Sequence, residues 1–425
     1  MTQVKRDVTF HHPNSAPWTS ASLNIIVQAI DAHNKDLQEI NAKIHSNPEL
    51  AFNEFMAHDN ITAMLQDIGF TVTKHAYGLK TSFVAEYGSG GRVVAFNAEY
   101  DALPQIGHAC GHNLIATSSI GAFIGLAAVL KELKLPGRVR IIGTPAEEEG
   151  GGKLHIIEAG AYEDVDACLM VHPAAHKRFP DGVTGVAYCR STANVKFRAH
   201  FIGKPAHAAT APWQGVNALD AVCLAYNGVS MLRQQMQTYE RVHGVITEGG
   251  LKPNIIPASA SVDYYCRSTT LNEAEALKDR VVKCFDGAAT ATGCSVEYEI
   301  INKYADLRPN KTLCSNYASA MDALGSPVIY DTGVINSGST DMGNVTYICP
   351  GFHGGFAIPA DPGAFNHTPS FTGAAATSKA HELAIITAKG MAIAGWNVLS
   401  DDDVAGRIRK EFEEDKKVRE GLSLN

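Results

Sequence analysis

The alternation of helix-like and strand-like segments over residues 22–171 limits the folds open to this chain more than any other feature. Apolar residues recur at three- and four-residue spacing over 22–44 and predict a helix there. Further helices are expected over residues 54–68, 114–133 and 153–159. Strands are expected over residues 70–74, 82–87, 92–98, 139–143 and 167–171. This alternation predicts an α/β domain with a mostly parallel central sheet.

The pattern changes after about residue 190. Strands are expected over 195–202, 241–246, 258–267 and 294–302, with helices over 215–235 and 272–291. That β-α-β-β-α-β order is typical of a ferredoxin-like α+β unit. Mixed α/β segments, ending in charged helices, follow over 306–425. We therefore expect one discontinuous domain, residues 1–191 and 306–425, with a ferredoxin-like domain inserted at residues 192–305.

Composition excludes several classes of protein. A hydrophobic content of 45% with a net charge of −8 argues against disorder and against a broad nucleic-acid interface. Residues 1–9 contain no apolar stretch that would indicate a signal peptide, and we expect no membrane span. The nine cysteines are odd in number and irregular in spacing, which favours a reducing compartment and a cytoplasmic location.

Potential metal ligands follow three of the predicted strands. Cys110 and His112 follow the strand at 92–98, Glu148 follows the strand at 139–143, and His172 ends the strand at 167–171. Taken alone, each of the three sites has a simpler explanation. Cys110 and His112 could belong to a polar loop with a core cysteine, Glu148 to a solvated run of glutamates, and His172 could be a polar cap of its strand. The coincidence of three strand ends favours a shared site, because ligand sites in open α/β sheets lie at the carboxyl ends of strands.

A fifth candidate ligand, His367, lies in a Gly/Pro-rich loop before an apolar helix. Thiolate, imidazole and carboxylate donors together suit a borderline metal ion. Two divalent ions could share the five ligands if Cys110 bridges them. Glu147, beside the ligand Glu148, is then the candidate general base. A metal pair with a carboxylate base indicates hydrolysis, and an amide is the expected substrate.

With these motifs, the chain resembles the dinuclear metallopeptidase family that includes aminoacylase and glutamate carboxypeptidase. Within it, the sequence is most similar to an amidohydrolase branch, near p-aminobenzoyl-glutamate hydrolase and Xaa-Arg dipeptidase. Residues 45–50 with Glu54 match the branch's opening motif, and residues 108–112 match its metal motif, in which cysteine replaces a bridging aspartate. Residues 145–148 match its catalytic pair, and His172 and His367 match its remaining ligands.

The resemblance implies further roles in the inserted domain. His207 matches a histidine that stabilises the tetrahedral oxyanion, often across a dimer interface. Asn254 and Arg267 match positions that hold the substrate carboxylate, and Ser339 and Thr340 lie in a segment like the family's substrate-side loop. The resemblance also implies two divalent ions per chain, zinc or manganese with cobalt possible. It further implies a homodimer formed through the inserted domain, which serves as lid and dimerisation domain.

Two positions depart from the branch. Asn113 stands where aspartate is common, and Glu149 replaces the usual glycine. The expected reaction is metal-dependent hydrolysis of a small N-acyl-amino acid or dipeptide that releases an amino acid with a free carboxylate. Two alternatives stay open: a hydrolase with Cys110 as its nucleophile, and a non-catalytic metal-binding regulator on the same scaffold.

Overall fold

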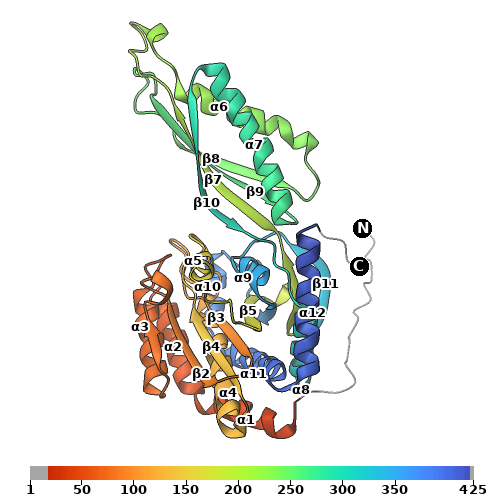
Figure 1. Cartoon of the computed structure of the whole chain (residues 1–425). Coiled ribbons are helices and arrows are strands. Elements are labelled where there is room, and N and C mark those ends of the chain that lie inside the picture. The colour runs from red at the N-terminus through yellow and green to blue at the C-terminus, as the bar shows by residue number, and fades with distance from the viewer. Residues whose placement is uncertain (1–17, 422–425) are drawn as a thin grey trace. The chain divides into compact units, whose positions relative to one another are not determined.

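Residues 18–421 are described by the computed structural model, and they form two units (Figure 1). Unit 2 comprises Ser191–Leu307 and Ile335–Gly343, and unit 1 comprises the rest of the described chain. The sequence prediction placed all of 306–425 in the catalytic domain. In the structure, residues 335–343 instead belong to unit 2. The amide and hydroxyl of Thr192, for example, both donate to the Gly338 carbonyl.

Within the described residues, unit 1 is built on an eight-stranded sheet in the order β1-β2-β4-β3-β5-β12-β6-β11. Its strands are β1 Val72–Lys74, β2 Phe83–Ser89, β3 Val93–Ala98, β4 Gly137–Gly143, β5 Ala167–Ala175, β6 Gly185–Ser191, β11 Ile329–Asn336 and β12 Gly351–Ile358. The central strands β4, β3, β5 and β12 pair in parallel, whereas β2 and β6 add antiparallel neighbours. All six residues of β3 are buried, as expected for a parallel strand covered on both faces.

Helices cover this sheet (Figure 1). They are α1 Ser20–Ala32, α2 Asn34–Ser46, α3 Phe55–Asp67, α4 His112–Leu133, α5 Gly152–Glu158, α8 Lys311–Ala323, α9 Met342–Ile348, α10 Pro369–Ala375, α11 Ser378–Ser400 and α12 Asp402–Arg419. The single helix predicted over 22–44 was wrong. The chain breaks at His33, whose φ of −99° and ψ of 10° end α1 and begin α2. Apolar spacing continues through the break because both halves pack on α4.

Helices α4 and α11 are each long and apolar enough, by length and composition, to cross a membrane. In the structure, however, 94% of the apolar window of α4 and 78% of that of α11 are buried. They pack against one another, and α4 also contacts β3, β5 and α1. A helix that is surrounded by other elements, as α4 and α11 are, needs apolar residues on all sides.

Unit 2 has the predicted β-α-β-β-α-β order. Its elements are β7 Ala193–Ile202, α6 Ala218–Leu232, β8 Arg241–Glu248, β9 Ser259–Ser268, α7 Leu271–Thr292 and β10 Ser295–Tyr304. The strands form an antiparallel sheet in the order β10-β7-β9-β8, and α6 and α7 pack against it. A capping box of Thr270 and Glu273 begins α7, and left-handed Gly293 ends it.

Candidate metal centre

The predicted ligands of unit 1 converge because their strands are neighbours. The carboxyl ends of β4, β3 and β5 lie at one edge of the sheet, and the loops there lead to Glu148 and Asp101. His172 lies within β5, which continues to Ala175, so the expectation that the strand ends at residue 171 was too short. His112 is the first residue of α4, and Cys110 lies in the loop two residues before it.

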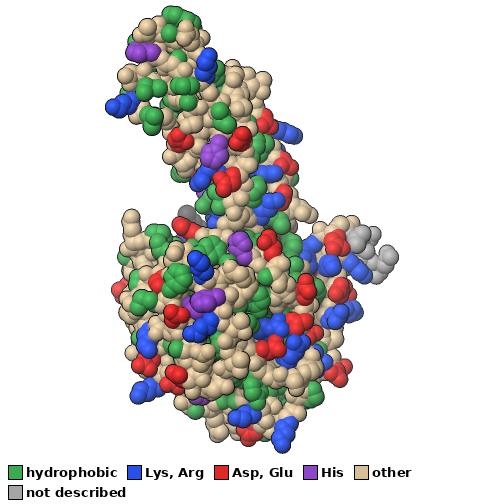
Figure 2. Space-filling view, turned by 60° about the vertical axis from the view of Figure 1, so that its left-hand side comes forward, with side chains coloured by type: hydrophobic (Ala, Val, Ile, Leu, Met, Phe, Trp, Pro, Cys, Tyr) green, Lys and Arg blue, Asp and Glu red, His purple; other side chains and the backbone are tan. Residues whose placement is uncertain are grey.

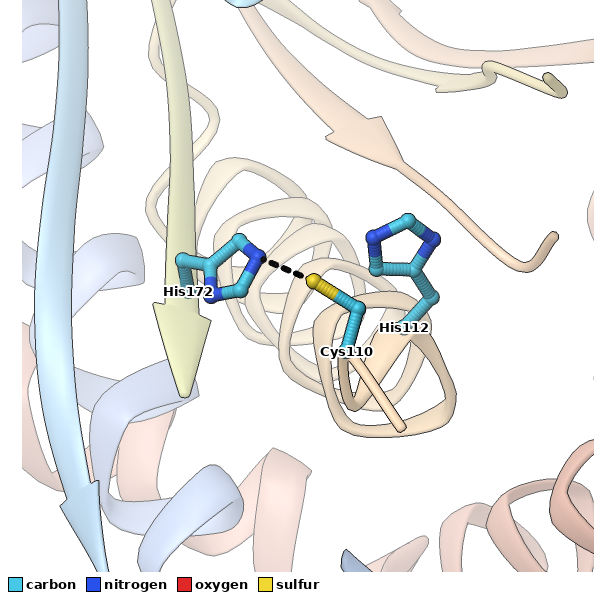
Figure 3. Close-up of side chains that lie close together, drawn as sticks. All are labelled: Cys110, His112 and His172. Carbon is cyan, nitrogen blue, oxygen red and sulfur yellow. Dashed lines mark hydrogen bonds between the residues drawn. The ribbon is translucent and has the colours of Figure 1, made fainter. Parts of the chain in front are cut away.

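Cys110 lies between two imidazole rings (Figure 3). Its Sγ is 3.2 Å from His172 Nε2. The other ring nitrogen of His172, Nδ1, is 2.8 Å from the carbonyl oxygen of Pro173. Since a carbonyl can only accept, Nδ1 carries the proton and Nε2 presents its lone pair toward Cys110. Such a fixed tautomer is usual for a metal-binding histidine.

His112 is oriented in the same way by a carboxylate. Its Nδ1 donates to Asp101 Oδ1 at 2.9 Å. Its Nε2 is buried without a hydrogen-bond partner among the described residues. That atom faces carboxylate oxygens of Glu99 at 3.6 Å, Glu147 at 3.9 Å and Glu148 at 3.8 Å. A buried imidazole nitrogen that faces several carboxylates is an arrangement that a metal cation would stabilise.

Two loops hold the remaining ligand pair. His367 Nε2 is 3.2 Å from Glu148 Oε1, and the backbone N–H of Glu148 donates to Asp101 Oδ2 at 3.0 Å. The backbone of His367 has a left-handed φ of 68°, and its N–H donates to the Ala109 carbonyl at 2.9 Å. Asp101 therefore orients His112 with one oxygen and positions the Glu148 backbone with the other.

The five predicted ligands form two groups that share one residue. Cys110, His112 and His172 make the first group, and Cys110, Glu148 and His367 make the second; within each group the ligand atoms lie within 4.8 Å of one another. A third group joins Glu99, His112 and Glu147. Because Cys110 belongs to both of the first groups, the residues present fit a pair of ions for which Cys110 would be a shared ligand.

The protonation equilibria of the site follow from burial. Burial lowers the pKa of His172 to about 4, which keeps its imidazole neutral and able to bind a metal. Burial also lowers the pKa of His112, but Asp101 and Cys110 outweigh that effect and raise it well above the ordinary value. Burial, reinforced by the charge of Glu148, raises the pKa of the Cys110 thiol well above its ordinary value. Reactive cysteines instead occupy positively charged, partly exposed sites.

Glycine is required at two positions beside the ligands. Gly111 has a φ of +82°, and a Cβ there would lie 2.6 Å from Pro173 Cγ. A Cβ on Gly152 would lie 1.9 Å from the Pro145 carbonyl oxygen. Close backbone approach therefore brings the ligand-bearing turns together.

Sequence reasoning missed several residues that support the centre. Asp101 and Glu99 lie in the polar stretch after β3, but no role had been predicted for either. Lys153 is completely buried, and its Nζ is 2.5 Å from Glu99 Oε1. The side-chain amide of Asn366 donates to the carbonyl oxygens of Cys110 and Pro173 at 3.3 and 3.1 Å. Asp101 could have been suspected because it lies close to the metal motif at residues 108–112. Nothing in the helix periodicity indicates that Lys153 would be buried.

The two departures from the family pattern lie in different surroundings. Asn113 is buried, and its amide donates to Asn41 Oδ1 at 2.7 Å and to the Ala375 carbonyl at 3.0 Å. Its position is thus explained by helix packing. Glu149 is exposed at the turn that follows the catalytic pair.

Unit 2 holds the other predicted site residues in two places. In the first, Arg267 Nη1 donates to Ser339 Oγ at 2.9 Å, and Arg267 Nε donates to His243 Nε2 at 3.2 Å. Thr340 is buried, and its hydroxyl accepts from the Met342 N–H at 3.2 Å, which makes it a helix-start residue in this structure. His243 had not been singled out from the sequence.

His207 and Asn254 form the second place, at the opposite end of the unit 2 sheet. His207 pairs with Ile255 in a β-bridge, and the Asn254 carbonyl accepts from the Ala208 N–H at 3.1 Å. His207 is exposed, and its Nδ1 accepts from two backbone N–H groups, those of Ala209 and Thr210, at 3.2 Å each. The imidazole proton therefore lies on Nε2, which is a hydrogen-bond donor.

These two places are far apart within unit 2. The loops with His207 and Asn254 adjoin the start of β9 at Ser259, whereas Arg267 is eight residues further along that strand. At about 3.4 Å per residue, the strand alone separates them by about 27 Å. An extended dipeptide spans only about 7 Å. One small substrate therefore cannot contact both places on a single copy of unit 2.

Comparison with known proteins gives consistent matches. A model of the peptidase family M20/M25/M40 matches residues 95–384. The Xaa-Arg dipeptidase of Mus musculus is 42% identical over 414 residues, which cover 94% of this chain and 93% of that protein. One chain of the p-aminobenzoyl-glutamate hydrolase of Escherichia coli (strain K12) is 34% identical over 320 residues, which cover 71% of this chain and 65% of that one. A solved Bacillus subtilis dinuclear metal-binding peptidase of family M20 superposes with a TM-score of 0.61 at 21% identity, over 87% of this chain and 99% of that one.

Proposed function

We propose that this chain, which belongs to the peptidase family M20/M25/M40 and is a metal-dependent hydrolase of small peptides or amides, cleaves dipeptides whose C-terminal residue is arginine. The observation that carries the hydrolytic chemistry is the pair of ligand groups that share Cys110 beside Glu147. The preference for arginine is supported by the mouse dipeptidase, which is 42% identical across 94% of the chain.

We propose two divalent ions as the cofactor. Cys110, His112 and His172 would hold one ion, and Cys110, Glu148 and His367 the other. A thiolate donor favours zinc over harder ions, with manganese and cobalt as the other candidates. When bound, such a pair polarises the scissile carbonyl and makes the attacking water more acidic.

Glu147 is the proposed general base. The residue is 8% exposed, and its Oε2 lies 3.9 Å from His112 Nε2, beside both ligand groups. In the proposed reaction it takes a proton from the attacking water as the new C–O bond forms. It then delivers that proton to the amide nitrogen as the C–N bond breaks, which releases the C-terminal amino acid.

Arg267 is the proposed partner of the substrate carboxylate. Its contacts with Ser339 and His243 use the Nη1 and Nε donors, and Nη2 takes part in neither. These contacts fix the plane of the guanidinium before substrate arrives. A fixed guanidinium plane suits bidentate recognition of a carboxylate.

A homodimer is the proposed assembly, with His207 and Asn254 acting on the substrate of the partner chain. The argument is the separation of about 27 Å along β9, because no single unit 2 brings these residues and Arg267 to one dipeptide. Apolar side chains are exposed on unit 2 (Figure 2), and in the proposed dimer they would be available for pairing. They include Val245 at 61%, Trp213 at 78% and Leu251 at 88% exposure. Strand β8, which carries Val245, is an edge of its sheet.

A complementation experiment tests the shared site. Glu147→Gln and His207→Ala proteins, each expected to be inactive, are mixed under conditions in which subunit exchange is verified by mass spectrometry of labelled chains. Recovery of activity supports action of His207 on the partner's substrate. Verified exchange without recovered activity shows that His207 acts within its own chain or not at all.

A substrate panel tests the proposed function itself. Metal-free protein is reloaded with zinc, manganese or cobalt and assayed on Xaa-Arg and Xaa-Glu dipeptides, p-aminobenzoyl-glutamate and N-acetyl-amino acids. We expect metal-dependent turnover that is fastest on Xaa-Arg. Faster turnover of another class would overturn the arginine preference. Activity that survives chelation and is lost on thiol alkylation would favour the Cys110 nucleophile instead.

A cytoplasmic location is also proposed. All nine cysteines fall within the described residues, and none forms a disulfide there. Free cysteines are usual in reducing compartments.

A further inference from the structure

Glu54 connects the opening motif of the chain to the catalytic turn. It lies just before α3 and is completely buried. Its Oε1 accepts from the backbone N–H of Ala146 at 2.9 Å and from that of Phe52 at 3.0 Å. Its Oε2 accepts from the hydroxyl of Thr81 at 2.8 Å. One side chain thus joins three segments of unit 1.

Ala146 is the residue whose backbone needs this support. It has a φ of +60°, in the left-handed region that alanine rarely occupies, and it immediately precedes Glu147 and Glu148. Its carbonyl accepts from the Gly151 N–H at 2.8 Å, so the turn is closed on one side by its own backbone. On the other side the Ala146 N–H is held by Glu54. Strained backbone of this kind persists only where surrounding contacts determine it.

A second contact joins the same two segments. Phe52 also has a left-handed backbone, with a φ of 59°. A Cβ placed on Gly150 would lie 2.4 Å from the Phe52 ring, so the ring packs directly on the catalytic turn. The hydrogen bond from Phe52 N–H to Glu54 fixes this segment to the same carboxylate oxygen that holds Ala146.

We propose that Glu54 is a positioning residue: it holds Ala146 in its left-handed conformation and thereby sets the directions of the base Glu147 and the ligand Glu148. The proposal rests on the proposed function insofar as it assigns Glu147 as base. Glu54 itself lies among backbone amides and Thr81 and acts through the turn. This role requires an acceptor oxygen within hydrogen-bond distance of the Ala146 N–H, and it does not require a negative charge on Glu54.

That distinction gives the test. In Glu54→Gln, the amide oxygen can accept from Ala146 and Phe52 while the amide nitrogen donates to the Thr81 hydroxyl. In Glu54→Ala, the two backbone N–H groups lose their acceptor. A matched control is Glu49→Ala, because the Glu49 carboxylate accepts from the backbone N–H groups of Met56 and Ala57 at 3.0 Å and supports α3 alone.

We expect Glu54→Ala to lower kcat by about 10²-fold with little change in KM, the scale of a misplaced catalytic group. Glu54→Gln should stay within about threefold of the parent, and Glu49→Ala should lose thermal stability but keep kcat. If Glu54→Ala does not fold, Glu54→Asp replaces it, since the shorter carboxylate cannot reach Ala146. An unchanged kcat in Glu54→Ala or Glu54→Asp, or an equal loss in Glu54→Gln or Glu49→Ala, would overturn the proposal.

Amide hydrogen exchange of residues 144–151 provides a readout without substrate or metal. Exchange should accelerate in Glu54→Ala and stay at the parental rate in Glu54→Gln and Glu49→Ala. Parental exchange in Glu54→Ala would refute the positioning role. Failure of the parent protein to cleave any dipeptide would instead refute the proposed function, while the exchange result would still decide the role of Glu54.

Discussion

The buried carboxylate of Glu54 should destabilise the metal-free protein in a way that depends on pH. Burial, followed by the negative charge of Asp101, raises the pKa of Glu54 from 4.5 to about 7, and hydrogen bonds from Thr81 and Ala146 only partly offset this. The folded state therefore binds the proton more tightly than the unfolded chain does. Tighter proton binding stabilises the folded state. The full stabilisation is present below about pH 4.5, where Glu54 is protonated in both states, and it is lost as the pH rises through about 7.

The magnitude follows from the change in pKa. Each tenfold change in the acid constant corresponds to about 1.4 kcal/mol. At pH 8 the ionised carboxylate lowers the free energy of unfolding by about 3 kcal/mol relative to a neutral group, and at pH 5 by about 1 kcal/mol. Glutamine is neutral at every pH. The advantage of Glu54→Gln over the parent should therefore grow by about 2 to 3 kcal/mol between pH 5 and pH 8.

Thermal unfolding of chelator-treated protein measures this difference. For a folded domain as large as unit 1, a change of about 1 kcal/mol in the free energy of unfolding corresponds to roughly 2 °C in Tm. The difference in Tm between Glu54→Gln and the parent should widen by about 5 °C from pH 5 to pH 8. Other titrating groups are common to both proteins and cancel in the difference. A Tm difference that stays constant across this range would refute the assignment of a raised pKa to Glu54.

Three further predictions concern the site directly. Glu147→Gln should lower turnover by at least ~10²-fold while elemental analysis finds the parental metal content; near-normal turnover would remove Glu147 from the mechanism. Cys110→Ala should reduce both turnover and the metal content from about two ions per chain, and an unchanged metal content would rule out a bridging sulfur. Arg267→Lys should raise KM by roughly tenfold or more with kcat nearly kept, because lysine lacks the planar fork; an unchanged KM would exclude Arg267 from carboxylate binding.

Much of the metal centre could be anticipated because it depends on local sequence order. Cys110, His112, Glu148 and His172 lie in or after the consecutive strands β3, β4 and β5, and parallel neighbours bring their carboxyl ends together whatever the details of packing. The structure accordingly places Cys110, His112, Glu148, His172 and His367 within two overlapping groups. The sequence did not predict the residues that support these ligands. The hydrogen bond from His112 to Asp101 and the buried ion pair of Lys153 with Glu99 depend on side-chain directions that residue spacing does not determine.

In the fold, too, the features with a local sequence signal were predicted and those without one were missed. The β-α-β-β-α-β order of unit 2 is visible in the sequence because each element has its own periodicity. The break at His33 and the assignment of residues 335–343 to unit 2 were missed. Neither has a clear local signal. Ile30 and Leu37 are seven residues apart, so the apolar pattern keeps its helical phase across His33. A short polar segment such as 335–343 shows no preference for one unit over the other.

The packing of the first helices against one of the last has a consequence for synthesis on the ribosome. Helices α1 and α2, which end at Ser46, pack partly against α11, which ends at Ser400. At about 5 to 20 residues per second, the apolar faces of α1 and α2 emerge roughly 20 to 70 s before α11 is complete. During that interval the nascent chain exposes surface that chaperones bind. Destabilising changes in α11 should therefore reduce soluble yield more than equal changes in unit 2, most of whose core is complete when Tyr304 has been added.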